Sequence, residues 1–186
     1  FSNAIRHLRE IASFLRILGT YPKEGEDSII KNEELEETYV VGILGFGRFG
    51  QFLGKELVKR FKVIATSRSS YENLANSYNI KWCNTLDDFF SNKLDCLIVS
   101  TSILSFEKII KKVSNYNLKD TLVVDVCSVK VFPKEVMLKY LPRCDLLCTH
   151  PMFGPDSGKI SWAGLPFVYE NVKIMDIERA NKFINF

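Results

Sequence analysis

The sequence lacks long apolar runs, paired cysteine motifs and the common hydrolase motifs. Its longest apolar run, Tyr39 to Phe46, takes up eight of the 186 residues, whereas a membrane-spanning helix needs about 20. The five cysteines form no CxxC pair and mostly lie in apolar stretches, which is typical of buried thiols in a reducing compartment. No GxSxG, HExxH or P-loop motif occurs, and Cys144, Cys148 and His150 have no second ligand cluster. We therefore expect no acyl transfer, no ATP use and no metal site.

A dense basic stripe is also missing, although the net charge is +3. Residues 21–38 hold seven acidic residues and two lysines, whereas the rest of the chain is mildly basic. Nucleic-acid-binding proteins usually carry a concentrated basic face, so this distribution favours a small anionic ligand. With 46% hydrophobic residues, the chain has the composition of a globular protein with a sizeable core.

The chain divides into segments of different character. Apolar residues recur every three or four positions from 4 to 18 and predict an amphipathic helix that ends near Gly19. Residues 23–38 predict a solvated acidic linker. From residue 39 onward, short apolar strands alternate with helices, which predicts an α/β fold with a doubly wound parallel sheet and a ligand site at the carboxyl ends of its strands. The predicted strands are 40–44, 62–66, 81–83, 95–100, 121–126 and 146–149, and the predicted helices are 48–60, 71–78, 86–91, 103–115 and 132–140.

A glycine motif, GFGRFG at 45–50, follows the first predicted strand and opens a helix. A dinucleotide-binding loop requires this context. Gly45 is expected to make the tight turn, Gly47 to let the backbone approach a pyrophosphate, and Gly50 to let the helix pack closely on the strand. A glycine turn without a ligand is the alternative. We predict that the whole loop binds the cofactor, namely Gly45, Phe46, Gly47, Arg48, Phe49 and Gly50.

The second predicted strand ends in ATSRSS at 65–70, with no acidic residue. NAD sites usually place Asp or Glu here, where it holds the 2′-hydroxyl of the adenosine ribose. Hydroxyls beside a guanidinium suit a 2′-phosphate instead, so Ser67, Arg68 and Ser69 predict NADP rather than NAD. The alternative is that Arg68 is an ordinary surface charge.

Candidate chemical groups follow the later strands. His150 is one of only two histidines and follows an apolar strand, which places it for general-base work beside the cofactor. Ser128, beyond the neighbouring strand, is expected to orient the substrate or the imidazole, and Asp156 to meet a cationic or hydroxyl group. A structural histidine, a cap hydroxyl and an Asx turn are the respective alternatives. Thr101 and Ser102 are expected beside the nicotinamide half of the cofactor, with a helix N-cap as the competing role.

Several segments together resemble the plant-type arogenate dehydrogenases, a branch of the prephenate dehydrogenase family. They are GFGRFGQFLGKEL, ATSRSSY, STSILS, VDVCSVKVFPKEV, LLCTHPMFGPDSGK and WAGLPFVY. The resemblance implies a Rossmann-type NADP-binding domain and oxidative decarboxylation of arogenate, or of prephenate, in tyrosine biosynthesis. It also implies that His150 matches the family's catalytic histidine, Ser128 the serine that holds the ring hydroxyl, and Asp156 an acid near the substrate.

The same resemblance implies what surrounds this domain. Family members continue into a C-terminal helical domain that forms a homodimer, so residues 175–186 are expected to be its start, with the remainder missing. Residues 1–22 resemble the last helix of the ACT regulatory domain of arogenate or prephenate dehydratases. We therefore expect a piece of a dehydratase–dehydrogenase fusion located in plastids, in which the dehydrogenase domain at 39–174 is poorly active alone.

Two other functions fit part of these observations. A β-hydroxyacid dehydrogenase or imine reductase would share the cofactor loop but would not require His150. A non-catalytic NADP-binding module would bind the dinucleotide without turnover. In each case we expect a small-molecule ligand, and neither nucleic acid nor a membrane, as the partner.

Overall fold

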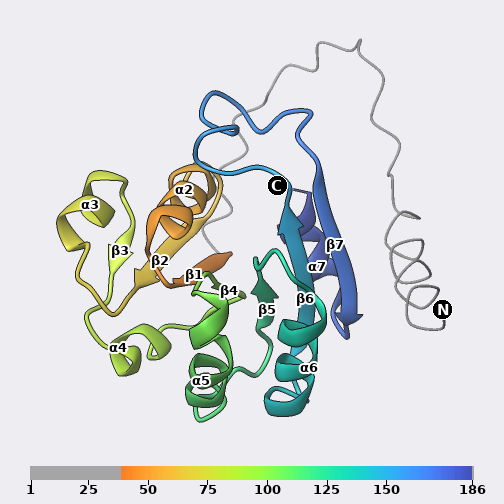
Figure 1. Cartoon of the computed structure of the whole chain (residues 1–186). Coiled ribbons are helices and arrows are strands. Elements are labelled where there is room, and N and C mark those ends of the chain that lie inside the picture. The colour runs from red at the N-terminus through yellow and green to blue at the C-terminus, as the bar shows by residue number, and fades with distance from the viewer. Residues whose placement is uncertain (1–38, 186) are drawn as a thin grey trace. The chain divides into compact units, whose positions relative to one another are not determined.

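In the described part of the chain, the alternating strands and helices form a seven-stranded sheet with helices on both faces (Figure 1). The computed structural model describes residues 39–185, so the predicted tail helix at 1–22 and linker at 23–38 lie outside the described residues. The strands are β1 (Val40–Leu44), β2 (Lys62–Thr66), β3 (Lys81–Trp82), β4 (Cys96–Val99), β5 (Leu122–Asp125), β6 (Asp145–Pro151) and β7 (Phe167–Lys173). The helices are α2 (Arg48–Leu57), α3 (Glu72–Ser77), α4 (Leu86–Phe90), α5 (Ile103–Val113), α6 (Val131–Tyr140) and α7 (Ile177–Ile184).

The sheet has the strand order β3-β2-β1-β4-β5-β6-β7. Strands β1 to β6 pair in parallel, which confirms the predicted doubly wound α/β fold. β7 instead pairs antiparallel with β6 and places Val168 opposite His150. The sheet is therefore mixed at this edge, where the sequence predicted no strand. The sequence of β7 gives no continuous apolar run, because this edge strand is only half-buried.

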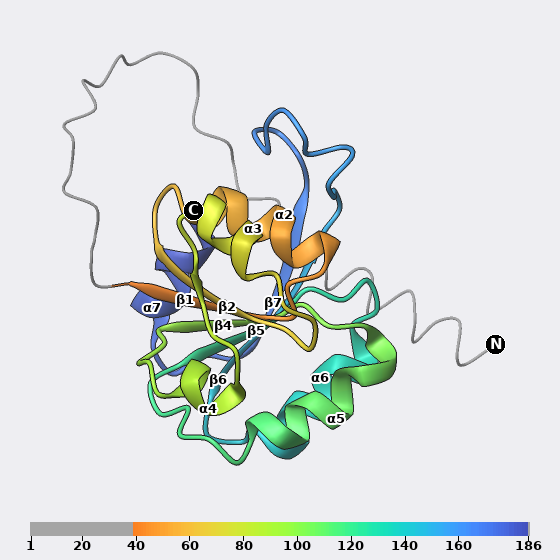
Figure 2. The ribbon, with the colours of Figure 1, turned by 90° about the vertical axis from the view of Figure 1, so that its left-hand side faces the viewer.

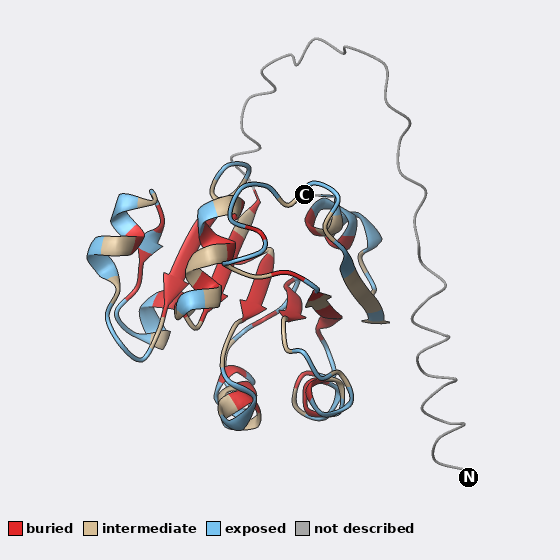
Figure 3. Cartoon of the chain, turned by 45° about the horizontal axis from the view of Figure 1, so that its top comes forward, coloured by how far each residue is buried: buried red, intermediate tan, exposed pale blue. Residues whose placement is uncertain are grey.

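Side-chain alternation along the strands creates two cores, one on each face of the sheet. Val41 and Ile43 of β1 face the first core, where they meet Leu53 of α2 and Phe183 of α7. Leu44 faces the second core, which α4, α5 and α6 cover. Figure 2 shows α2 and α3 on one face of the sheet, with α4, α5 and α6 on the other. Figure 3 shows the parallel strands as the most buried layer between them.

The cysteines and the helices bear on two further expectations. Cys83, Cys96, Cys144 and Cys148 are buried, and Cys127 is half-buried, as expected for thiols that pack in a core. None of the helices in the described part of the chain is long and apolar enough to cross a bilayer. The described side chains also include no group of three or more His, Cys, Asp or Glu residues arranged to hold a metal ion.

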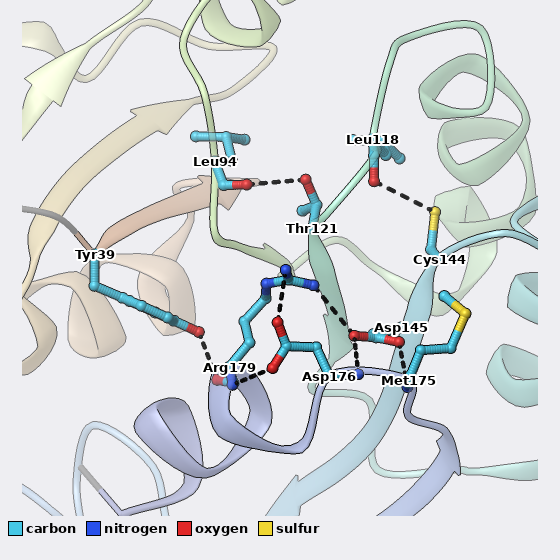
Figure 4. Close-up of polar contacts among 9 residues, drawn as sticks. All are labelled: Tyr39, Leu94, Leu118, Thr121, Cys144, Asp145, Met175, Asp176 and Arg179. Carbon is cyan, nitrogen blue, oxygen red and sulfur yellow. Dashed lines mark hydrogen bonds and ion pairs between the residues drawn. The ribbon is translucent and has the colours of Figure 1, made fainter.

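A buried carboxylate ties the last helix to the sheet at the amino ends of the strands (Figure 4). Asp145, at the start of β6, accepts from the backbone N–H of Met175 at 2.6 Å and from Arg179 at 3.2 Å. Asp176 caps α7 by accepting from the N–H of Arg179 at 2.9 Å. The hydroxyl of Tyr39 donates to the carbonyl oxygen of Arg179 at 3.0 Å. These contacts hold the two ends of the described chain at the amino ends of the strands, whereas the predicted site lies at their carboxyl ends.

Helix α7 contributes to the core of the sheet. Ala180 and Phe183 are buried with residues of β1, and the helix belongs to the same compact unit as the strands. The domain boundary at residue 174, with 175–186 as the start of a further helical domain, stays a prediction. Whatever follows it, α7 already covers part of one face of the sheet.

Candidate functional site

Two adjoining cavities lie at the carboxyl ends of the parallel strands, where sheets of this kind bind ligands. The β2–α5 cavity has a volume of about 630 Å³ and lies between the end of β2 and helix α5. The His150 cavity has a volume of about 570 Å³ and lies between the glycine loop and the ends of β5 and β6. Gly47, Ser100, Thr101 and Ser102 line both cavities, so the two meet over the glycine loop.

The cavities bring together most of the predicted site residues. Three do not line either cavity, namely Phe46, Gly50 and Asp156. The β2–α5 cavity is lined by Gly45, Gly47, Ser67, Arg68, Ser69, Thr101 and Ser102, and the His150 cavity by Gly47, Arg48, Phe49, Thr101, Ser102, Ser128 and His150.

The glycine loop is shaped by two close backbone approaches. Gly45 has a φ of +101°, and a Cβ on it would lie 2.3 Å from the carbonyl oxygen of Ser100. A Cβ on Gly50 would lie 2.1 Å from the carbonyl oxygen of Gly45, so only glycine lets α2 pack this closely on the loop. A Cβ on Gly47, in contrast, would meet no atom within 4 Å. The loop therefore presents bare backbone to open space at the point where the two cavities meet.

The start of α2 also faces this point. Gly47 is the N-cap residue, and its carbonyl accepts from the N–H of Gln51 at 2.9 Å as the helix begins. The first turn contains no acidic residue. The N–H groups of a helix N-terminus and the positive end of the helix dipole favour an anion, so a pyrophosphate fits here.

Phe46 differs from its neighbours in the loop. Its side chain is fully buried, with ring centroids 6.0 Å from Trp82 and 6.3 Å from Tyr71. Its carbonyl oxygen accepts from the Gln51 amide at 2.9 Å. The predicted cofactor contact of Phe46 is therefore not a side-chain contact: the ring anchors the loop to the core.

Thr101 and Ser102 offer hydroxyls where the two cavities join. The Thr101 hydroxyl oxygen is buried and makes no hydrogen bond with the described residues. Ser102 occupies the N-cap position of α5, but its hydroxyl caps no backbone N–H and instead contacts Ser105 at 3.2 Å. Buried polar groups are normally hydrogen-bonded, so the unpaired hydroxyl of Thr101 fits a ligand that supplies the missing partner.

The polar wall of the β2–α5 cavity comes from two elements. Ser67, Arg68 and Ser69 follow β2, while Lys108 and Lys112 lie on α5. No Asp or Glu is among the described residues that line this cavity. The lysines were absent from the predicted site. Their spacing of four residues on a helix that follows a sheet strand is a signal that could have indicated them.

His150 and Ser128 line the same cavity because β5 and β6 are parallel neighbours. Asp125 pairs with Cys148, so the segments that follow both strands reach the same edge of the sheet. His150 is half-buried, and burial, followed by the charge of Lys130, lowers the pKa of its imidazole. The opposing effect of Asp125 is smaller. Burial and the Lys130 charge both favour the neutral form of the imidazole, which can accept a proton.

Lys130 joins this part of the site to the core. Its ammonium group donates to Asp125 Oδ1 at 2.5 Å and to the carbonyl oxygen of Thr149, the residue before His150. Asp125 is fully buried, and its Oδ1 also accepts from the N–H of Cys127 at 3.0 Å. The Thr149 hydroxyl donates to the Asp125 carbonyl oxygen at 2.6 Å. These bonds hold the end of β5 and the backbone beside His150 in one arrangement.

Asp156 lies outside the His150 cavity. Its side chain is 85% exposed and forms an ion pair with Arg48, with Arg48 Nη2 2.7 Å from Asp156 Oδ1. Nearby in the same loop, Phe153 and Trp162 pack their rings against Phe52 of α2. The loop after β6 is thus fastened to α2. The predicted contact of Asp156 with substrate stays a prediction.

The sequence matches a known family. It fits the sequence model described as prephenate dehydrogenase, nucleotide-binding domain, over residues 50–175. It is 47% identical over 151 residues to the Arabidopsis thaliana protein named arogenate dehydrogenase 2, chloroplastic, a match that covers 77% of this chain and 42% of that protein. The chain therefore spans less than half the length of this relative.

Two solved structures share the fold at low sequence identity. One is prephenate dehydrogenase from A. aeolicus in complex with hydroxyphenyl propionate and NAD+, with a TM-score of 0.65, 20% identity, and coverage of 80% of this chain and 56% of that chain. The other is Synechocystis arogenate dehydrogenase, with a TM-score of 0.65, 19% identity, and coverage of 78% and 55%. At these identities the likeness shows the fold alone.

The matched model covers more than half of the described residues and most of both cavity walls. It confirms the resemblance found in the sequence motifs, and with it the coarser prediction of a nicotinamide dinucleotide as cofactor. The chain belongs to the prephenate dehydrogenase family, of which it carries the nucleotide-binding domain.

Proposed function

We propose that the full-length protein catalyses the NADP-dependent oxidative decarboxylation of arogenate, or of prephenate, in tyrosine biosynthesis. The observation that carries this proposal is the shared cavity of His150 and Ser128, which adjoins the dinucleotide-binding loop. The 47% identity to a protein named arogenate dehydrogenase supports the same substrate class. Because the chain spans less than half of that relative, we propose this activity for the full-length protein.

The proposed reaction uses two side chains of this chain. Ser128 holds the ring hydroxyl of the substrate, and the neutral imidazole of His150 accepts the hydroxyl proton. As that proton leaves, a hydride departs from the ring carbon that bears the hydroxyl. Loss of carbon dioxide from the ring then makes the ring aromatic, and the resulting phenolate oxygen takes up a proton. When bound, the nicotinamide supplies the acceptor for the hydride. The lowered pKa of His150 favours the neutral imidazole, which accepts the hydroxyl proton in the first step.

The preference for NADP over NAD rests on the end of β2. Ser67, Arg68 and Ser69 line the β2–α5 cavity, and no acid lies beside them to hold a 2′-hydroxyl. A guanidinium binds a phosphate with charge-assisted hydrogen bonds. We assign the pyrophosphate to the start of α2, with Gly47 giving it access.

The decisive experiment is an assay of the full-length protein with arogenate and prephenate, each offered NADP+ and NAD+, in which the reduced cofactor is followed. Turnover of arogenate with NADP+ is the expected result. Turnover of prephenate alone would keep the chemistry and change the substrate. Tight binding of NADP+ without turnover of either substrate would instead favour a non-catalytic binding module.

Replacement of His150 distinguishes the proposed reaction from that of a β-hydroxyacid dehydrogenase or imine reductase. In the proposed reaction His150→Asn lowers kcat by a factor of about 10² to 10⁴, as for a lost general base. A β-hydroxyacid dehydrogenase or imine reductase would not depend on this residue. Unchanged binding of NADP+ by the variant would show that the loss concerns chemistry.

The wider context belongs to the same proposal. We propose a dehydratase–dehydrogenase fusion in which residues 1–22 end an ACT domain, and a C-terminal helical domain that forms a homodimer. A plastid location agrees with the name of the Arabidopsis relative. Sequencing of the full transcript tests the fusion, because an initiator Met just upstream of Phe1 would contradict it.

A further inference from the structure

We propose that Lys108 and Lys112 of α5 form a second wall of the 2′-phosphate subsite, opposite Arg68. This inference deepens the proposed function and rests on its preference for NADP. It starts from the β2–α5 cavity, whose described lining carries Arg68, Lys108 and Lys112 as its charged side chains and contains no acidic residue.

The two lysines share one face of α5. Residues four apart on a helix are neighbours, and two like charges at this spacing destabilise the helix. The acid of this helix does not relieve the repulsion, since Glu107 contacts the Tyr140 hydroxyl at 3.0 Å and Lys139 at 3.6 Å, on the side of α6. An anion in the cavity would relieve it.

None of the three cations has an ion pair or a side-chain hydrogen bond within residues 39–185. Lys130 and Arg179, in contrast, form ion pairs with Asp125 and Asp145. What distinguishes Arg68, Lys108 and Lys112 from other unpaired cations of the surface is that all three line one cavity whose described lining has no acidic residue. Three positive groups around one cavity favour a dianionic phosphate over a neutral ribose diol.

The positions of Lys108 and Lys112 along α5 indicate which phosphate of NADP these lysines would contact. The pyrophosphate is assigned to the start of α2, beside Gly47 and the N-cap residue Ser102 of α5. At about 1.5 Å per residue, Lys108 lies about 9 Å and Lys112 about 15 Å along the helix from Ser102. The lysines thus line the part of the cavity away from the pyrophosphate, together with Arg68 at the end of β2.

The test measures dissociation constants by titration calorimetry for the 186-residue chain and three single variants. Lys108→Ala and Lys112→Ala remove the proposed contacts. Lys111→Ala is the matched control, because Lys111 is exposed on the same helix, lines neither cavity and changes the net charge equally. The ligands are NADP+ and NAD+, with 2′,5′-ADP and 5′-AMP as the adenosine pair that differs in the 2′-phosphate.

The expected result is a loss of NADP+ and 2′,5′-ADP affinity of about five- to tenfold in each cavity variant, as for one lost hydrogen bond. Affinity for NAD+ and 5′-AMP should stay within about twofold, and Lys111→Ala should match the unaltered chain. Equal losses for NADP+ and NAD+ would overturn the inference, since the lysines would then serve the shared part of the dinucleotide.

The same data separate this inference from the proposed function. If the unaltered chain binds NADP+ no better than NAD+, the NADP preference itself fails. If it prefers NADP+ but both lysine variants retain that preference, Arg68 and the serines suffice and only the inference about α5 is wrong.

Discussion

The ammonium group of Lys130 lies 2.5 Å from the buried Oδ1 of Asp125 and also donates to the carbonyl oxygen of Thr149. This pair links the end of β5 to the backbone that carries His150. Both charges of this pair are shielded from water, because the side chain of Asp125 is fully buried and that of Lys130 is only 12% exposed.

Removal of one partner of this pair should be costly. Lys130→Met leaves Asp125 as an uncompensated buried charge, and we expect the free energy of unfolding to fall by about 3–5 kcal/mol in urea titrations. The double variant Asp125→Asn/Lys130→Met should recover a large part of that loss. Lys134→Met is the control, since its half-exposed pair with Glu170 should be worth less than about 1 kcal/mol. A Lys130→Met variant as stable as this control would contradict the argument.

The pH dependence of kcat/KM in the full-length enzyme should report the protonation of the His150 imidazole. Burial and Lys130 place the pKa of His150 below its ordinary value of 6.5. The protonated imidazole cannot accept a proton, so kcat/KM should fall only when the pH drops below that lowered pKa. Loss of the Lys130 charge raises the pKa, and the acid limb should move to higher pH in Lys130→Met. A limb that stays in place in this variant would show that another group controls it.

Substitutions in the glycine loop should separate folding from binding. Gly45→Ala forces a Cβ to within 2.3 Å of the Ser100 carbonyl oxygen at a φ of +101°, so we expect it to lose at least about 1–3 kcal/mol of stability. Gly47→Ala meets no protein atom within 4 Å and should keep the stability of the unaltered chain. Its methyl group would, however, enter the space assigned to the pyrophosphate. Calorimetry should therefore show weaker NADP+ binding for a variant whose unfolding curve is unchanged, whereas equal affinity would move the pyrophosphate elsewhere.

The ion pair between Arg48 and Asp156 gives a further test. Both side chains are largely exposed, so Asp156→Asn should not shift the midpoint of urea unfolding. The carboxylate neutralises a guanidinium in the wall of the His150 cavity, beside the start of α2. Its loss should tighten NADP+ binding a few-fold at low salt and less at high salt. If the affinity instead falls, Asp156 supports the cofactor site rather than competing for Arg48.

Local sequence patterns predicted most of the fold. The strands β1 and β2 were predicted with their observed bounds, and each helix from α2 to α6 within a few residues, because a buried parallel strand leaves an apolar run and an amphipathic helix a regular spacing. The edge strand β7 was missed for the same reason: its half-exposed residues carry no such signal. Helix α7 was expected only as part of another domain, although its Phe183 packs in the core of the sheet.

The sequence by itself determined the dinucleotide loop, the hydroxyls and guanidinium after β2, and His150 as the candidate base, since each follows a strand within a few residues. Only the tertiary structure decided what surrounds them. The hydrogen bond of Lys130 to the Thr149 carbonyl, the ion pair of Arg48 with Asp156 and the cavity shared by Arg68 and the lysines of α5 join elements that the chain order separates. Such contacts depend on strand order and helix packing, which no local pattern records.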